Sequence, residues 1–284
     1  MKILRRAGIV KQWLVVVFVL LSFFFHAQVS CFGLQDAPAK VSKSTWMPGW
    51  LTVTFVDVGK GDATIVRLPD GRSCLIDTGY AETTEKLFKS IEKRGITAFD
   101  LVVVTHFHKD HVGGLPSVLE KMPVKQVIQP FDPREKNRTL RVKVGDVLMS
   151  GEGYKLAVVG PRKLFSDEND ASLVLRLTFG TTSFLFAGDI VEEAQGDLLK
   201  NSSVLRSSVL KVPHHGRYEG FSPRAFFQTV RPNFAIITCD NSNNEPPEGS
   251  VVRILEELGA QVMRTDQQGN VGFRTDGKEL TLLP

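Results

Sequence analysis

Hydrophobic residues alternate with polar ones in short, β-branched stretches from residue 51 onward. The first half contains LTVTFVDV, DATIVRL and SCLIDTG, separated by turns with glycine, and then the continuously apolar DLVVVT. Alternation predicts strands with one buried face, whereas a short continuous run predicts a strand covered on both faces. ETTEKLFKSIEKRG has helical spacing and ends at a glycine. We therefore expect strand after strand here, with occasional helices.

The second half follows the same order of elements. YKLAVVGP, SLVLRLTFG and TSFLFAGD predict strands, the last two joined by a hairpin, and VLKVPHHG and FAIITCD predict two more. IVEEAQGDLLK, PRAFFQTV and GSVVRILEELG predict helices, and VMRT, NVGFRT and KELTLL predict terminal strands. Mostly β segments in each half, each finished by helices, indicate an α+β fold. The arrangement we expect is a four-layer αββα sandwich, with two sheets face to face and helices outside.

An apolar run lies far upstream of these strands, over residues 13–25, where only Ser22 is polar. As a helix it would be about 20 Å long, short of the roughly 30 Å of bilayer hydrocarbon. Four basic residues and no acid precede it. This order predicts a signal peptide over residues 1–31 and hence export to a periplasmic or extracellular location, with an uncleaved membrane anchor as the alternative. A linker over residues 32–48 then leads to one domain over residues 49–284.

The net charge looks different once the expected signal peptide is removed. The full chain is formally +4, with 35 basic and 31 acidic residues. Residues 1–31 hold four basic residues and no acid, so 31 of each remain. Global charge therefore gives no reason to expect nucleic-acid binding, although a local basic groove would still fit. Cys74 and Cys239 end apolar runs and are expected to be buried free thiols, although export permits a disulfide.

Histidine carries the candidate chemistry. Five of the six histidines fall in two clusters at predicted strand ends, THFHKDHVGG and VPHHGR. Zinc and similar ions take imidazole nitrogens and carboxylate oxygens as ligands, so the clusters predict a metal site. His106 and His108 can face one ion, and Asp110 and His111 can face a second. Asp189 leaves an apolar strand in LFAGD; a helix N-cap is the alternative role, but the neighbouring motifs favour a bridging metal ligand.

HFHKDH resembles the signature of the metallo-β-lactamase superfamily. Together with FVDVGKGDATIV, LIDTG, ENDASLVLRLTFGTTSFLFAGD and LKVPHHG in that order, it resembles more narrowly the C-terminal hydrolase-like domain of the competence protein ComEC family. The resemblance implies the αββα fold and two divalent ions, zinc above all, with manganese as the alternative. The ligands it implies are His106 and His108 for the first ion, Asp110, His111 and one of His214 and His215 for the second, and Asp189 between them.

Further residues match positions around that site. Asp77 matches an aspartate that supports the ligand loop through hydrogen bonds. Asp57 and Asp62 match acids near the same face, and we expect them to shape the site. The third histidine that many members provide for the first ion is missing. The ComEC-like proteins carry an Asn-Asp pair in this region, matched by Asn169 and Asp170, so either one of these ligates or the first site is weak.

The resemblance implies hydrolysis of a phosphodiester, with single-stranded DNA or another phosphodiester as the binding partner. Bound ions lower the pKa of water and supply hydroxide, and Asp110 is the residue we expect to be catalytic by orienting that water. Two alternatives stay open. The bond cleaved is a lactam, thioester or lactone, or the chain is a non-catalytic binding module with a degenerate metal site. No protein partner can be inferred, and membrane contact is expected only through an uncleaved N-terminal segment.

Overall fold

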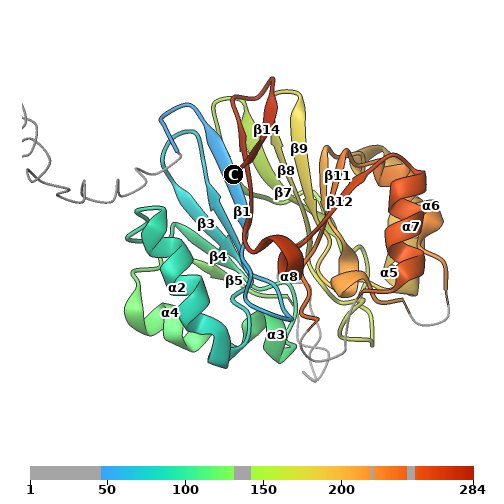
Figure 1. Cartoon of the computed structure of the whole chain (residues 1–284), viewed down its shortest axis with the longest axis horizontal. Helices are drawn as coiled ribbons and strands as arrows, with labels where there is room; N and C mark the ends of the chain where they lie inside the picture. The colour runs from blue at the N-terminus through green and yellow to red at the C-terminus, as the bar shows by residue number, and fades with distance from the viewer. Residues whose placement is uncertain (1–45, 131–141, 219–220, 242–246) are drawn as a thin grey trace, which may run out of the picture. The chain divides into compact units, whose positions relative to one another are not determined.

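The computed structural model describes residues 46–130, 142–218, 221–241 and 247–284. The expected signal peptide and most of the expected linker lie outside these residues, so the domain boundaries remain predictions. Within the described part, no helix has both the length and the apolar character needed to cross a membrane. Two seven-stranded sheets lie face to face, with helices on their outer sides (Figure 1). The expected αββα sandwich is confirmed.

The first sheet combines strands from both ends of the described chain. In spatial order its strands are β14 (Leu280–Leu283), β13 (Val271–Thr275), β1 (Leu51–Phe55), β2 (Thr64–Arg67), β3 (Ser73–Ile76), β4 (Leu101–Val103) and β5 (Val127–Ile128). β3, β4 and β5 run parallel, and the other neighbours are antiparallel. The last two strands, β13 and β14, join this sheet through the pairing of β13 with β1, so the last strands of the described part complete the sheet with which it begins.

The second sheet is antiparallel on one side and parallel on the other. In spatial order its strands are β12 (Gln261–Arg264), β11 (Phe234–Ile237), β10 (Val209–Lys211), β9 (Thr182–Phe186), β8 (Val174–Phe179), β7 (Tyr154–Gly160) and β6 (Val147–Gly151). β9 to β12 run parallel, and β8 and β9 form the expected hairpin. The parallel strands end at one edge of the sheet, which makes that edge the natural place for a site.

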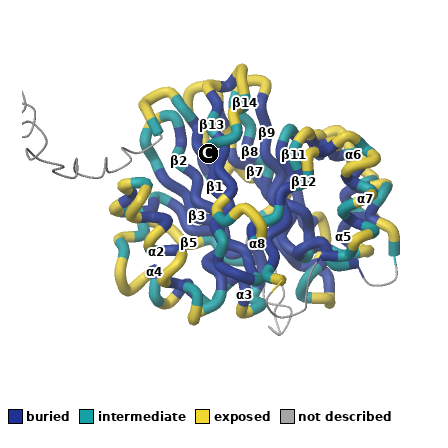
Figure 2. The backbone as a smooth tube through the Cα atoms, viewed as in Figure 1, coloured by how far each residue is buried: buried dark blue, intermediate teal, exposed yellow. Residues whose placement is uncertain are grey.

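The longer helices cover the outer faces of the two sheets (Figure 1). The helices of the described part are α2 (Thr84–Lys93), α3 (Lys109–Val112), α4 (Leu115–Lys121), α5 (Glu192–Leu199), α6 (Arg224–Val230), α7 (Gly249–Glu257) and α8 (Thr265–Gln268), with short 3-10 turns η1 (Ala81–Thr83), η2 (Ser202–Val204) and η3 (Pro213–Gly216). α2 and α4 flank the first sheet, and α5, α6 and α7 flank the second (Figure 1). Exposed residues gather on the helices and loops, while the strands are mostly buried (Figure 2).

The main hydrophobic core lies between the sheets. Phe55 of the first sheet and Phe186 of the second have ring centroids 6.2 Å apart, and Phe273 packs edge-on against Phe55. β4 has no polar face. Leu101 and Val103 belong to this core, and Val102 belongs to the hydrophobic cluster that includes the buried hydrophobic residues of α2. The prediction that this run is covered on both faces is therefore confirmed. Cys74 and Cys239 are buried free thiols, as expected.

Candidate metal centre

The candidate ligands lie where parallel strands end. Asp77 directly follows β3, and the loop that begins at Thr105 follows β4. Asp189 follows β9, and His215 follows β10 through the turn η3. The carboxyl ends of these strands meet at one edge of the sandwich, so residues far apart in the chain converge there.

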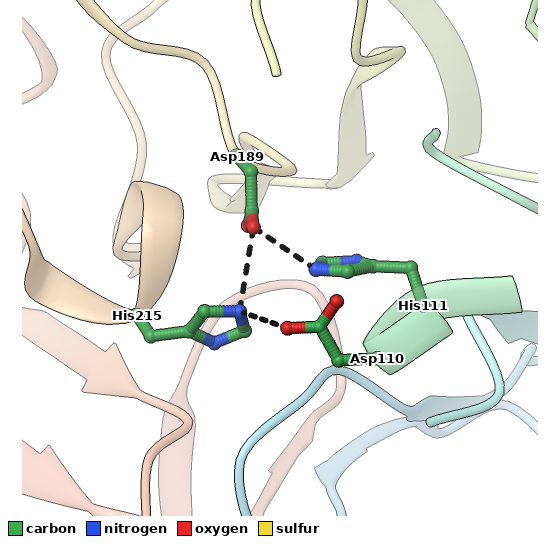
Figure 3. A group of neighbouring side chains, drawn as sticks. All are labelled: Asp110, His111, Asp189 and His215. Carbon is green, nitrogen blue, oxygen red and sulfur yellow. Dashed lines mark hydrogen bonds and ion pairs between the residues drawn. The ribbon is translucent and has the colours of Figure 1, made fainter. Parts of the chain in front are cut away.

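Asp110, His111, Asp189 and His215 form one cluster, which we call the metal-ligand cluster. One ligand atom from each of the four lies within 4.8 Å of those of the others. Nε2 of His111 is 3.1 Å from Oδ2 of Asp189, and Nε2 of His215 is 3.3 Å from both that oxygen and Oδ2 of Asp110 (Figure 3). Two imidazoles and two carboxylates that converge in this way offer the donor set that a divalent transition metal takes.

The two nitrogens of His215 have different surroundings. Nδ1 donates a hydrogen bond to the carbonyl oxygen of Thr238 at 2.8 Å. Nε2 is buried and has no hydrogen-bond partner among the described residues, although it faces Asp110 and Asp189. An imidazole fixed at one nitrogen by a carbonyl oxygen, with the other nitrogen directed at carboxylates, is the usual state of a metal-binding histidine. The residues present therefore fit a metal ion.

Asp77 orients the His111 ring through a hydrogen bond. Its Oδ2 accepts a hydrogen bond from Nδ1 of His111 at 2.9 Å, and Oδ1 accepts one from the backbone N–H of Thr105 at 2.7 Å. The hydroxyl of Thr105 adds a third bond at 2.7 Å. These contacts fix the start of the ligand loop and leave Nε2 of His111 for Asp189. A carboxylate that accepts a hydrogen bond from one ring nitrogen of a histidine in this way fixes the ring so that its other nitrogen can bind a metal ion.

Opposite charges in the cluster shift the pKa values of its members. Burial disfavours charge on His111, but Asp189, Asp77 and Asp62 outweigh it and hold the pKa of His111 well above its ordinary value. Burial also works against charge on His215, yet Asp189 helps raise its pKa to about 9. The pKa of Asp189 stays well below its ordinary value despite burial, because both imidazoles favour the carboxylate. In the metal-free chain these histidines hold protons, which a metal ion must displace.

His106 and His108 lie together beside the cluster. Nε2 of His106 is 3.1 Å from Nδ1 of His108 and 3.8 Å from Oδ2 of Asp189. Burial and the neighbouring His111 hold the pKa of His106 well below its ordinary value, so this ring stays in the neutral form that binds metals. His108 is half-exposed at the rim, where its Nε2 lies 3.7 Å from Glu168.

His214, Asn169 and Asp170 do not enter the metal-ligand cluster. Oδ1 of Asp170 accepts hydrogen bonds from the backbone N–H groups of Val191 and Ala194, at 2.8 and 3.1 Å, at the start of α5. Asn169 and His214 line a neighbouring pocket of about 480 Å³, and each has a buried polar atom with no partner among the described residues. Of the two adjacent histidines, His215 is thus the one that enters the cluster.

Asp57 lies outside the metal-ligand cluster, whereas Asp62 lies beside it. Asp57 accepts the N–H of Gly59 at 3.0 Å and lies 3.5 Å from Lys86, outside the cluster. The carboxylate of Asp62 is buried, accepts the hydroxyl of Thr238, and lies 3.6 Å from Nδ1 of His215. The adjoining Gly61 has φ 132°, and a Cβ there would meet the carbonyl oxygen of Asp110 at 2.6 Å. The glycine therefore allows this loop to approach the ligand turn.

Lys211 is the residue that our sequence reasoning missed. It is the last residue of β10 and is buried. Its Nζ forms an ion pair with Asp62, lies 3.4 Å from Oδ1 of Asp189 and donates to the carbonyl of Gly188 at 3.2 Å. The available signal was a lysine inside the apolar run VLKV, because a buried lysine needs a carboxylate partner.

The fold and the cluster define a metallo-hydrolase. The sequence model of the metallo-beta-lactamase superfamily matches residues 56–225, and the chain belongs to that superfamily. It is therefore a metal-dependent hydrolase of this class, with a cluster able to hold a metal ion. A solved structure of a CmlA beta-hydroxylase mutant shares the fold, with a TM-score of 0.52, 15% identity and coverage of 79% of this chain and 54% of that one.

Within the superfamily, the chain is similar to competence proteins, as its resemblance to the ComEC family predicted. It is 28% identical to ComE operon protein 3 of Bacillus subtilis over 255 residues, which covers 78% of this chain and 33% of that protein. It is also 28% identical to competence protein ComA of Neisseria gonorrhoeae over 224 residues, covering 78% and 32%. The chain thus spans about a third of the length of these relatives.

A shorter match involves a different named activity. Hydroxyacylglutathione hydrolase of Xylella fastidiosa is 31% identical over 123 residues, which covers 43% of this chain and 42% of that protein.

Proposed function

We propose that the chain is an exported hydrolase of phosphodiesters that acts on single-stranded DNA and depends on bound divalent ions, with zinc preferred over manganese. One observation carries the proposal: the buried Nε2 of His215, which has no hydrogen-bond partner among the described residues, lies 3.3 Å from carboxylate oxygens of both Asp110 and Asp189. The choice of substrate is supported by the similarity to ComE operon protein 3 and competence protein ComA.

The residues would divide between two ion positions. Asp110, His111 and His215 would hold one ion, His106 and His108 the other, and Oδ2 of Asp189 faces both sets. Ions held there would lower the pKa of water and neutralise negative charge on a transferred phosphoryl group.

Asp110 is placed to act on the attacking water. Burial works against its charge, but His215 and His111 keep the pKa of Asp110 well below its ordinary value, so its carboxylate is ionised at neutral pH. One carboxylate oxygen faces His215, and the other points away from it (Figure 3). An ionised oxygen at this position can accept a hydrogen bond from water and orient a lone pair toward phosphorus.

The pocket of about 480 Å³ is the proposed place for the substrate next to the scissile bond. Burial lowers the pKa of His214, which keeps this imidazole neutral and able to accept or donate a hydrogen bond. Phe221 lines the same pocket and offers an apolar ring against which a base can stack. Single-stranded substrates suit such a pocket because their bases are free to leave the stack.

The same pocket supports a second candidate, a small thioester, lactone or lactam. Asp167, Glu192 and Glu193 line it with exposed carboxylates, which repel a polyanion unless bound ions offset them. The match to hydroxyacylglutathione hydrolase also favours a thioester. Cleavage of a thioester or lactam, with no attack on DNA, would select this candidate.

The test is cleavage of end-labelled single-stranded DNA by the purified chain, loaded separately with zinc and manganese. We expect cleavage that chelator abolishes and that Asp110→Ala lowers by at least about 100-fold. Unchanged cleavage in Asp110→Ala would show that another residue or a contaminant is responsible. Export is tested separately, by locating the chain after cell fractionation and sequencing its N-terminus.

A further inference from the structure

A second hollow lies at the opposite ends of the strands that carry the metal centre. Its volume is about 700 Å³. It forms where three parallel strands begin: Ser183 lies at the start of β9, Ser208 precedes β10 and Asn233 precedes β11. β9 has five residues and is thus about 17 Å long, and Asp189 follows its other end. This hollow is therefore separate from the metal-ligand cluster.

Three arginines line the hollow, and no acidic residue of the described part of the chain lines it. Arg176 comes from β8, Arg206 from the segment before β10, and Arg231 from the end of α6. Across the described residues, none of these arginines forms an ion pair with a carboxylate. Three guanidinium groups that share a hollow without a paired carboxylate repel one another, and a bound anion would relieve that repulsion.

Structural roles do not account for all three arginines. Nη2 of Arg176 donates to the carbonyl of Arg206 at 2.8 Å, which fixes the segment before β10. The carbonyl oxygen of Val230, at the end of α6, accepts a hydrogen bond from the backbone N–H of Ser207 at 3.1 Å. The side chain of Arg231 is therefore not needed to cap this carbonyl. The side chains of Arg206 and Arg231 are exposed and make no hydrogen bond to another residue of the described part.

The backbone of Arg231 points to a role for its side chain. It has φ 47° and ψ 58°, the left-handed conformation in which helices usually end on glycine. An arginine there is less favourable than a glycine, because its Cβ crowds the following carbonyl. The residue nevertheless brings a guanidinium group to the hollow.

We propose that this arginine-lined hollow binds a phosphate group of a small ligand or of a nucleic-acid strand. The planar guanidinium fork matches two phosphate oxygens, which explains the gathering of arginines rather than lysines. The hydroxyls of Ser183 and Ser208, which within the described part only accept hydrogen bonds from backbone N–H groups, add donors beside the arginines. The volume exceeds that of a free phosphate ion and is in the range that holds a nucleotide-sized ligand. The proposal is independent of the substrate proposed for the metal centre.

The test is calorimetric titration of the full chain after chelation, so that the metal centre cannot contribute bound ions. The probes are inorganic phosphate, 2′-deoxyadenosine 5′-monophosphate and a short 5′-phosphorylated oligothymidylate. Arg206→Gln and Arg231→Gly each remove one guanidinium group, and the glycine suits the left-handed backbone. Arg224→Gln is the matched control, since Arg224 pairs with Glu257 outside the hollow.

We expect at least one probe to bind the wild type and the Arg224→Gln control equally, and each hollow variant about tenfold or more weakly. The probe that binds most tightly identifies the source of the phosphate group. Absence of binding for all three probes, or equal binding in wild type and both hollow variants, overturns the proposal. Loss of binding in Asp110→Ala also overturns it, because that result places the probe at the metal centre.

Discussion

The ammonium group of Lys211 holds one oxygen of Asp189, with Nζ 3.4 Å from Oδ1, and both side chains are buried. Oδ2 of the same carboxylate faces the histidines of the metal-ligand cluster. The lysine thus fixes the orientation of the carboxylate that lies between the two expected ion positions. It also compensates the charge of Asp62.

Removing this lysine should destabilise the chain. Lys211→Met removes the lysine cation shared by the buried carboxylates of Asp62 and Asp189 and leaves them only the imidazoles, so we expect a loss of about 3–5 kcal/mol in the free energy of unfolding of the metal-free protein. Urea denaturation after chelation measures it. Lys200→Met is the control, because Lys200 is exposed and pairs only at the surface with Asp197. A loss no larger than that of the control contradicts this role for Lys211.

Substitution of Asp77 should weaken metal binding without touching a metal ligand. Asp77→Asn keeps the shape of the side chain but removes the charge that supports His111. We expect zinc affinity to fall by about 10–100-fold, the range seen when outer-layer partners of histidine ligands are changed. Competition with a chromophoric chelator gives the affinity. Asp57→Asn serves as the matched change outside the cluster. An equal fall in zinc affinity in the two variants would contradict the role of Asp77 in supporting His111.

We expect Asp170 to stabilise the fold and not to bind a metal ion. Its carboxylate accepts two backbone N–H groups at the start of α5. Asp170→Ala should therefore cost about 0.5–2 kcal/mol of unfolding free energy, as for other helix caps, and leave the number of bound ions unchanged. Thermal denaturation and metal analysis separate these effects. Loss of one ion in Asp170→Ala, but not in Asn169→Ala, would instead identify Asp170 as the missing ligand of the first ion.

The metal-free chain should lose stability as pH rises from neutral. The pKa of His215 is raised to about 9 in the folded chain, from an ordinary value of 6.5. A raised folded pKa contributes stability that is fully present below the unfolded pKa and is lost as pH rises through the folded one. We therefore expect the unfolding free energy, measured in chelator, to decline between about pH 6.5 and pH 9. His215→Gln should flatten this decline, and an unchanged slope in that variant would assign it to other groups.

Several features were predictable because they depend on local patterns. Strand alternation and the two histidine clusters identified the αββα sandwich and a metal site at strand ends, and His106, His108 and Asp189 do lie together there. The choice between His214 and His215 was not predictable. Both residues have positive φ, at 48° and 54°. The direction of the His215 ring depends on the turn η3 and on the carbonyl of Thr238, which follows the neighbouring strand β11.

Other features depend on contacts between segments that are far apart in the chain. The pairing of β13 with β1 joins residues more than half the domain apart, which alternation within a strand does not encode. Asp170 lies next to Asn169 in sequence, yet only the folded chain shows that its carboxylate meets the start of α5. Lys211 was overlooked for the same reason, since its two carboxylate partners come from different sheets.

The most direct measurement is the zinc content of the purified chain, taken by elemental mass spectrometry after equilibrium dialysis, for wild type, His215→Ala and His214→Ala. If Asp110, His111, Asp189 and His215 form the metal centre, the wild type retains at least one ion per chain, His214→Ala retains the same number, and His215→Ala loses one. Less than one ion per chain in the wild type, or equal content in wild type and His215→Ala, would contradict the metal centre described here.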